Sequence, residues 1–326
     1  MTQPRITVLA TGGTIAGKAG SATRHDYRPG QIGIDELLGQ VSALGIDSQF
    51  RGQQIANIGS EDIGEQIWAQ LHRAALAAIN DPACNGVIIT HGTDTVEETA
   101  FLFDQTLPAD KPVVMVGAMR PADAVGSDGL RNFANAVQVV SDGDAAGRGV
   151  LVVMGDKVFA ARDIRKARTA SADAFAGYPR DEIGLVRPSK LEWFGAPWRS
   201  GEEARFAYPD PWPEVALIYI YAGITADVAA RQITGKTRAV IVAGVGEGNM
   251  PEAVRDYLAG LAKAGMIVVR ASRVEEALVD RAPSDDELGF IAVRALRPAK
   301  ARILVQLMLA SGKADRVAIQ AEFDRR

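Results

Sequence analysis

Thr14 stands where the chain could present a nucleophile to a ligand. It follows Gly12 and Gly13 directly, and these follow the apolar run RITVLA at residues 5–10. The glycines allow a sharp turn and let a ligand approach the backbone closely. A threonine hydroxyl becomes a nucleophile when a base takes its proton. The stretch ATGGTIAG therefore indicates nucleophilic chemistry, and the alternative role for Thr14 is a turn residue that satisfies local backbone groups.

A second hydroxyl-bearing turn follows another apolar run, GVIIT. The stretch ITHGTDTVEET at 89–99 places Thr93 and Asp94 just after that run. Thr95 and Glu98 have the spacing of a capping box, which predicts the start of a helix. Because that box accounts for the helix start, Thr93 and Asp94 have no structural task and are candidates for chemistry.

Either hydroxyl needs a base, and the residues leave two candidates. His91 stands in the second turn, but a histidine there could equally bond to the backbone. Lys166, in ARDIRKART, is the other candidate, because burial lowers the pKa of a lysine and lets it accept a proton. The alternative role for Lys166 is a solvated surface charge.

The first turn also resembles part of a nucleotide-binding loop. Gly12 to Lys18 reads G-x-x-x-x-G-K, but Ala19 follows where Ser or Thr would hold Mg²⁺. The next residues contain Gly and Pro and do not predict a helix whose N-terminal N–H groups could face phosphates. Asp156, after a later apolar run, could imitate a metal-binding aspartate, but that pattern is common. The stretch after Lys18 is better interpreted as a mobile loop, with Tyr27 near its end.

Alternating strands and helices must position these turns. Continuous apolar runs separated by helical patterns are typical of a parallel sheet covered on both faces. Ligands bind beyond the carboxyl ends of such strands, where the candidate residues fall. The expected strands are 5–10, 86–90, 112–117, 149–154, 216–222, 239–245 and 266–271, and the expected helices are 34–44, 65–79, 96–107 and an amphipathic one at 298–310.

Composition divides the 326 residues in two. Residues 191–213 carry Pro, Trp and charge without periodicity, which is typical of a linker. We therefore expect an α/β protein with two domains. The larger N-terminal domain, 1–190, has a mostly parallel sheet with helices on both faces, and a smaller C-terminal α/β domain spans 214–326.

Charge and hydropathy argue against several partners. The net charge is −4 and no Lys/Arg-dense run occurs, so nucleic acid is not expected. No apolar stretch reaches the ~18 residues of a membrane helix, so no membrane partner is expected. The N-terminal apolar run is too short for a secretory signal, which predicts a cytoplasmic protein, or a periplasmic one if a signal peptide was removed. Cys84 is the one cysteine and is expected to be inert, and the three histidines lack metal-ligand spacing.

Together, the motifs resemble the bacterial-type L-asparaginase and glutaminase-asparaginase family along essentially the whole chain. The hallmarks are ATGGTIAG at 10–17 and ITHGTDTVEET at 89–99. Each supporting match is weak alone, but eight motifs in order are specific. The supporting matches are NIGSED at 57–62, KPVVMVGAMRP at 111–121, SDG at 127–129, RDIRKA at 162–167, AGVGEGN at 243–249 and KARILVQL at 300–307.

The resemblance implies an amidohydrolase that converts L-asparagine to L-aspartate and ammonia through an acyl-enzyme, with minor glutaminase activity and without a cofactor. It implies that Thr14 is the nucleophile and that Tyr27, on the loop, polarises its hydroxyl. It also implies a second catalytic group of Thr93, Asp94 and Lys166. In that group Thr93 either attacks or activates water, and we assign the first attack to Thr14.

The resemblance further implies how the substrate is bound. Ser60 and Asp94 match the site for its α-carboxylate and α-amino group, and the carbonyl of Ala118 falls beside the leaving amide. The family is typically a homotetramer, a dimer of dimers, in which a neighbour's second domain completes each site, and Asn249 matches that neighbour's contact. The implied substrate-binding residues are Gly13, Ser60, Glu61, Gly92, Thr93, Asp94, Ala118 and Asn249.

Two departures from the family concern the substrate. Glu61 stands where some members have Gln, which bears on the preference between asparagine and glutamine. Relatives usually carry a Glu that binds the substrate amine across the subunit interface, and Pro283 stands there in this chain. Either Glu275, Glu276 or Asp280 replaces that carboxylate, or amine recognition is weaker. We expect weaker recognition and a high KM for L-asparagine.

Three alternatives lie near this function. A glutaminase-asparaginase of broad specificity would use the same residues. The subunit of a tRNA-dependent amidotransferase usually carries an extra N-terminal domain, whereas this chain begins directly at its first expected strand. A non-catalytic binding protein on the same scaffold would lack a Thr or the Lys, but Thr14, Thr93, Asp94 and Lys166 are all present.

Overall fold

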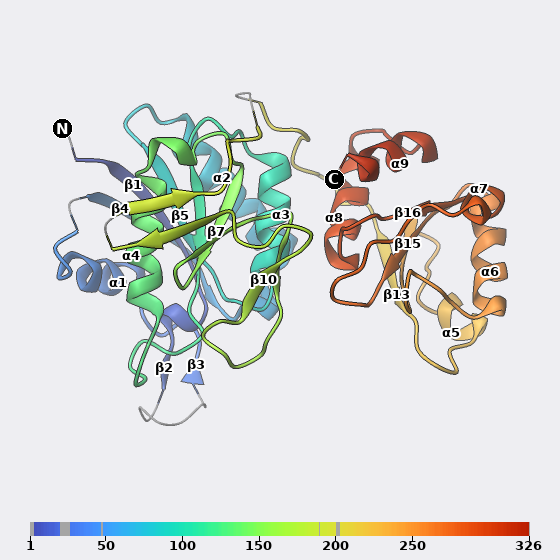
Figure 1. Cartoon of the computed structure of the whole chain (residues 1–326), viewed down its shortest axis with the longest axis horizontal. Helices are drawn as coiled ribbons and strands as arrows, with labels where there is room; N and C mark the ends of the chain where they lie inside the picture. Colours follow the sequence, from blue (N-terminus) through green and yellow to red (C-terminus); the bar gives the residue numbers. More distant parts are fainter. Residues whose placement is uncertain (1–2, 20–26, 47, 189, 200–202, 326) are drawn as a thin grey trace. The chain divides into compact units, whose positions relative to one another are not determined.

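The chain folds into two compact units, Met1–Arg205 and Phe206–Arg326 (Figure 1). The computed structural model describes residues 3–19, 27–46, 48–188, 190–199 and 203–325. The division between the N-terminal and the C-terminal unit falls inside the segment that the sequence marks as a linker.

The N-terminal unit is built on an eight-stranded sheet with the order β12-β11-β8-β7-β6-β5-β1-β4. The five strands from β7 to β4 pair in parallel, and β8, β11 and β12 add to one edge in antiparallel fashion. This arrangement confirms the mostly parallel sheet. The strands are β1 (Arg5–Gly12), β4 (Gln49–Ile58), β5 (Gly86–Thr90), β6 (Val113–Val116), β7 (Val150–Met154), β8 (Lys157–Ala160), β11 (Gly184–Arg187) and β12 (Lys190–Trp193).

Helices cover both faces of this sheet. Alternate strand residues such as Val8 and Val114 share one apolar cluster with α1 and α4. The residues between them, such as Leu9, are equally buried on the other face, where α2 and α3 pack. Burial on both faces explains why the strands have continuous apolar sequences. The helices are α1 (Ile34–Ser42), α2 (Glu65–Asn80), α3 (Val96–Thr106) and α4 (Gly129–Val140).

The C-terminal unit is a smaller α/β domain with its own core. Its four-stranded parallel sheet has the order β13-β14-β15-β16, and α6 packs on one cluster of alternate strand residues. The elements are β13 (Val215–Tyr219), α5 (Ala226–Ala230), β14 (Ala239–Gly244), α6 (Glu252–Lys263), β15 (Ile267–Ser272), α7 (Pro283–Leu288), β16 (Phe290–Ala292), α8 (Pro298–Ala310) and α9 (Arg316–Asp324).

The expected start of the linker and the expected amphipathic helix at 298–310 are both wrong. The linker does not begin at 191, because Leu191 to Trp193 belong to β12, which pairs with β11. Trp193 donates to Asp142 Oδ1 (3.1 Å), and the guanidinium of Arg148 lies over its ring, 4.1 Å from the centroid. These contacts override the irregular composition.

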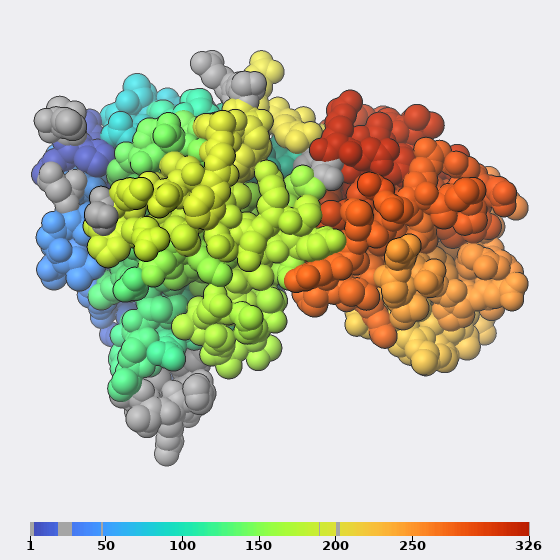
Figure 2. All heavy atoms as spheres, viewed as in Figure 1, coloured from blue at the N-terminus to red at the C-terminus, as the bar shows by residue number. Residues whose placement is uncertain are grey.

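In the face shown in Figure 2, the segment from β7 to β12 forms much of the surface of the N-terminal unit.

The second error concerns α8, which is not amphipathic. It is buried on nearly every side, including the side chains of Lys300 and Gln306. The Gln306 amide donates to the Pro213 carbonyl at 3.0 Å, so a polar residue is accommodated inside the unit. Among the helices of the described residues, none is both long enough and apolar enough to span a bilayer.

Candidate active site

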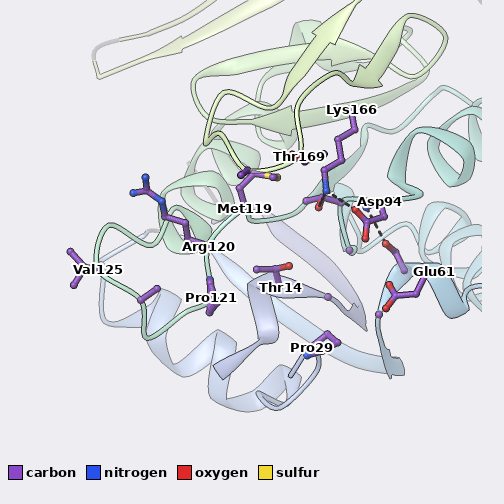
Figure 3. A pocket seen from close by; sticks show the side chains of 17 residues that line it. Thr14, Pro29, Glu61, Asp94, Met119, Arg120, Pro121, Val125, Lys166 and Thr169 are labelled. Atoms are coloured by element: carbon purple, nitrogen blue, oxygen red, sulfur yellow. Dashed lines mark hydrogen bonds and ion pairs between the residues drawn. The ribbon is translucent and has the colours of Figure 1, made fainter. Parts of the chain in front are cut away.

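A pocket of about 950 Å³ opens at the carboxyl end of the parallel strands in the N-terminal unit (Figure 3). Its walls come from the segments after β1, β4, β5 and β6 and from the end of a short strand, β9 (Ile164–Lys166). Asp94 and Glu61 lie at one end of the pocket, Arg120 and Val125 at the other, and Thr14 between them. The lining residues are Gly13, Thr14, Pro29, Gly59, Ser60, Glu61, Gly92, Thr93, Asp94, Met119, Arg120, Pro121, Ala124, Val125, Lys166, Thr169 and Ala170.

Glycines bring three of these segments into contact. Gly13 has a φ of +78°, and a Cβ there would lie 2.5 Å from the Cα of Gly92. A Cβ on Gly92 would in turn lie 2.8 Å from the Cβ of Ser60. Only residues without a side chain allow this approach. The glycines of the two hallmark motifs thus gather Thr14, Thr93 and Ser60 around one cavity.

Thr14 occupies the position that the sequence predicts. It begins a 3₁₀ turn, Thr14–Ala16, directly after β1, and its buried side chain points into the pocket. Tyr27 lies in the short strand β3 (Tyr27–Arg28), whose backbone pairs with β2 (Lys18–Ala19). The side chain of Tyr27 lies outside what the structure describes.

Lys166 joins Thr93 and Asp94 in one hydrogen-bonded group. Its Nζ donates to Thr93 Oγ1 at 2.9 Å and to Asp94 Oδ1 at 2.6 Å. The Lys166 side chain is 19% exposed and the Asp94 side chain is 61% exposed, and both line the pocket. The hairpin of β9 and β10 (Phe175–Gly177) delivers this lysine. Lys166 is therefore a pocket residue and not a solvated surface charge.

Ser60 connects the same group to the segment after β4. Asp94 N–H donates to Ser60 Oγ at 3.1 Å, and the Thr95 hydroxyl donates to the Ser60 carbonyl at 2.7 Å. The predicted capping box is therefore wrong, because the Thr95 side chain makes no cap hydrogen bond to α3. Its hydroxyl instead fixes the position of Ser60 at the pocket.

His91 has a structural role. Its Nδ1–H donates to the Gly92 carbonyl at 2.7 Å, so Nε2 accepts from Thr99 Oγ1 at 2.9 Å. Trp68 Nε1 donates to the same Thr99 oxygen at 2.8 Å. Burial lowers the pKa of His91 to about 4 because it penalises the charged form, while the Gly92 contact acts in the opposite direction. His91 is neutral, enclosed and outside the pocket lining.

The residues that suggested a nucleotide site have other partners. Lys18 lies in β2, not in a helix, and its ammonium pairs with Glu36 at 2.9 Å. Asp156 pairs with Arg131 at 2.7 Å.

Cys84 is buried and its thiol donates to the Gly86 carbonyl at 3.2 Å. In the described part of the chain, no group of three or more His, Cys, Asp or Glu could hold a metal ion.

Two expected binding residues, Ala118 and Asn249, are not among the residues that line this pocket. Ala118 is fully buried next to Gly117 and is not among the lining residues, although Met119 is. Asn249 belongs to the C-terminal unit, in the turn after β14.

The sequence also missed several lining residues. The segment 119–125 follows β6, and Asp128 shapes it by accepting from the N–H groups of Met119 and Arg120. The sequence feature that could have indicated the segment 119–125 is the motif SDG at 127–129, which contains Asp128. Thr169 and Ala170 carry no signal beyond their closeness to Lys166 in the chain.

Comparisons with known proteins agree with this architecture. Residues 5–199 match the family model "Asparaginase, N-terminal", and residues 214–323 match "Glutaminase/Asparaginase C-terminal domain". The chain is 39% identical to L-asparaginase 2 of Escherichia coli (strain K12), over 99% of this chain and 93% of the relative. It is 34% identical to the glutaminase-asparaginase of Pseudomonas fluorescens biotype A, over 93% of this chain and 86% of the relative.

A solved structure is similar over the same length. The crystal structure of a probable cytoplasmic L-asparaginase from Campylobacter jejuni matches with a TM-score of 0.92 and 36% identity, over 99% of this chain and 100% of that chain. The two α/β domains and the L-asparaginases that they match over nearly the whole chain define the protein as an amidohydrolase. The chain belongs to the asparaginase family.

Proposed function

We propose that the protein hydrolyses the side-chain amide of L-asparagine to L-aspartate and ammonia. The observation that carries this proposal is the hydrogen-bonded group of Lys166, Thr93 and Asp94 on the same pocket as Thr14. Amide hydrolysis needs a nucleophile, a route for protons and donors for the developing oxyanion. The pocket holds a candidate for each, and the relatives named L-asparaginase support the substrate.

In the first half of the proposed reaction, Thr14 Oγ attacks the amide carbon and Tyr27 polarises its hydroxyl. The Asp94 N–H already donates to Ser60, so we assign the Thr93 N–H as the oxyanion donor of that turn. One such donor contributes about 3 kcal/mol to the transition state. The C–N bond then breaks, the nitrogen takes the proton that Thr14 Oγ has lost and leaves as ammonia, and an ester to Thr14 remains.

In the second half, water attacks that ester and L-aspartate leaves. Thr93 is positioned for this step, because its Oγ1 lies 2.9 Å from Lys166 Nζ. Lys166 Nζ would take the Thr93 proton, and Thr93 would take one from the water. Asp94 bonds the lysine and orients it. The bond between the acyl carbon and Thr14 Oγ then breaks, Thr14 Oγ takes the proton that water gave to Lys166 through Thr93, and the product acid ionises to L-aspartate.

Substrate recognition is proposed at the polar end of the pocket. Ser60, Glu61 and the exposed Asp94 carboxylate would bind the α-amino and α-carboxylate groups, beside the backbone of Gly13 and Gly92. The carbonyl of Ala118 would contact the leaving amide from behind the lining residues.

We also propose that amine recognition is weak and that KM for L-asparagine is high. Of the carboxylates that could replace the missing glutamate at Pro283, Glu275 is paired with Arg297 and Asp280 with Arg294 inside their own unit. A KM in the low micromolar range would contradict this proposal.

The assembly and the location are proposals as well. We propose a homotetramer, a dimer of dimers, in which the domain at 214–326 of a neighbouring copy brings Asn249 to the site. Analytical ultracentrifugation tests the tetramer, and a monomer with full activity would contradict it. We propose a cytoplasmic location, or a periplasmic one if a signal peptide is removed, and fractionation of the native host distinguishes the two.

The decisive experiment is ammonia release from L-asparagine and L-glutamine at neutral pH, with Thr14→Ala beside the native chain. Release from L-asparagine that is lost in the variant supports both the reaction and the nucleophile. No release from either amide would contradict the proposal. The relative named glutaminase-asparaginase favours a second candidate, a broader enzyme, because one methylene in a pocket changes the free energy by only about 1–3 kcal/mol. Comparable rates on both amides would identify that candidate.

A further inference from the structure

Arg270 connects three segments of the C-terminal unit from the middle of β15. Its Nε and Nη2 donate to the two carboxylate oxygens of Asp285, at 2.8 and 2.6 Å. Nη2 also donates to the Asp280 carbonyl at 2.6 Å, and Nη1 donates to the Glu247 carbonyl. The Arg270 side chain is 12% exposed and that of Asp285 is 3% exposed, so the pair is nearly enclosed.

These contacts hold the turn at 245–249 against β15. The turn is closed by hydrogen bonds between Val245 and Asn249, and β15 adds a second attachment through Ser272. Ser272 Oγ donates to the Gly246 carbonyl at 2.5 Å. A Cβ on Gly248 would lie 2.7 Å from Cγ of Arg270, so the turn packs directly on the arginine stem.

The same contacts hold the segment that precedes α7. Asp285 accepts from the Ala282 N–H at 2.8 Å while its carboxylate faces Arg270. The two segments line a cavity of about 370 Å³ that includes Asn249 and Ser284. This cavity lies at the carboxyl end of β14 and β15, where open parallel sheets bind ligands.

Stability alone is a weak reason for such a pair. Taking two charges out of water is costly, and apolar residues of equal volume often stabilise a fold as well or better. An apolar pair could not hold two backbone carbonyls and a carboxylate around one planar group, as the guanidinium of Arg270 does.

We infer that Arg270 is a positioning residue that sets the conformation of the 245–249 turn and so the direction of the Asn249 side chain. The inference rests on the proposed function, in which Asn249 contacts the substrate bound by a neighbouring copy. Arg270 touches no reacting atom and acts only through that turn.

The test is the kinetics of Arg270→Lys on L-asparagine. Lysine keeps the charge but cannot reach Asp285, Asp280 and Glu247 together. We expect KM to rise about tenfold, the size of one lost charge-assisted contact, with kcat within about threefold of the native value. A kcat that falls in proportion to the folded fraction, at unchanged KM, would overturn the inference.

A double-mutant cycle with Asn249→Ala makes the test specific. If Arg270 acts through Asn249, the double variant has the KM of Asn249→Ala alone, because the second change has nothing left to misplace. Multiplicative effects on KM would show that Arg270 acts independently of Asn249 and would overturn the inference.

Two further variants complete the test, one as a control and one as a second way to loosen the 245–249 turn. Arg325→Lys alters an exposed arginine that pairs with Glu322 at 3.5 Å, and we expect native kinetics from it. Ser272→Ala removes the second attachment and loosens the turn if Arg270→Lys does not fold, and we expect a smaller rise in KM. A native chain that releases no ammonia from L-asparagine would overturn the proposed function, whereas native-like Arg270→Lys and Ser272→Ala would overturn only this inference.

Discussion

Thr93 and Thr99 each bond a nitrogen at 2.9 Å, and the two sites differ in almost everything else. Thr93 Oγ1 accepts from Lys166 Nζ beside an exposed carboxylate at the pocket. Thr99 Oγ1 bonds His91 Nε2 inside the core and accepts from Trp68 as well. In the first site a ligand can approach the hydroxyl, and in the second every neighbouring position is occupied by protein.

The two distances are equal, so the distance between a hydroxyl and its nitrogen partner does not decide the role of the pair. What differs is whether a ligand can reach the hydroxyl. His91 is the histidine of a hallmark motif, yet its enclosure keeps it neutral and uses both ring nitrogens. Lys166 enters from a distant hairpin and keeps one face toward the pocket.

The largest effect is expected from Lys166→Met. Loss of the proton acceptor for Thr93 should lower kcat by about 10²–10⁴-fold. Thr99→Val is the matched control, because it breaks the buried pair, and its kcat per folded molecule should stay native. Steady-state ammonia release measures both, and an equal loss of kcat in the two variants would break the comparison.

The next effect is a loss of folding stability at acid pH, caused by the buried His91. The folded pKa of His91 is about 4, below the 6.5 of the free side chain, so its contribution to stability is complete above pH 6.5. The contribution is lost as pH falls from 6.5 toward 4, because the unfolded chain binds the proton first, and the loss amounts to about 3 kcal/mol.

Urea unfolding of the native chain and of His91→Gln measures this effect. The stability gap between the two should be larger at pH 7 than at pH 4.5. A gap that does not change with pH would show that His91 is not held neutral in the folded state.

A smaller effect is expected for the stability of Thr99→Val. The substitution removes the hydroxyl that Trp68 Nε1 and His91 Nε2 share in the core. An unsatisfied buried group costs about 1–3 kcal/mol, so the thermal midpoint should fall. Thr93→Val, at the open pocket, should lower the midpoint less, and the reverse order would contradict the burial argument.

The smallest effect is expected from Glu61→Gln. The residue lies at the polar end of the pocket but outside the group of Lys166, Thr93 and Asp94. The ratio of kcat/KM for L-asparagine and L-glutamine should change by less than about tenfold, which corresponds to 1.4 kcal/mol. A loss of kcat as large as that of Lys166→Met would place Glu61 in the reacting group.

Local signals predicted the elements well where packing and propensity agree. The strand at 86–90 has the expected bounds, and α2 and α3 lie within one residue of theirs. The capping box failed because the Thr95 hydroxyl found a tertiary partner in the Ser60 carbonyl. The linker was placed too early because Trp193 gains its order from Asp142 and Arg148, which are distant in the chain.

The sequence by itself determined the two-domain α/β fold, the glycine turns after β1 and β5, and the threonines that they present. These features depend on local patterns, such as apolar runs and glycines at sharp turns. Only the tertiary structure showed which of His91 and Lys166 lies at the pocket. His91 is two residues from Thr93 in the chain and is turned into the core. Lys166 is 73 residues away and is brought to 2.9 Å by the β9–β10 hairpin, because pairing between distant segments depends on how the whole unit packs.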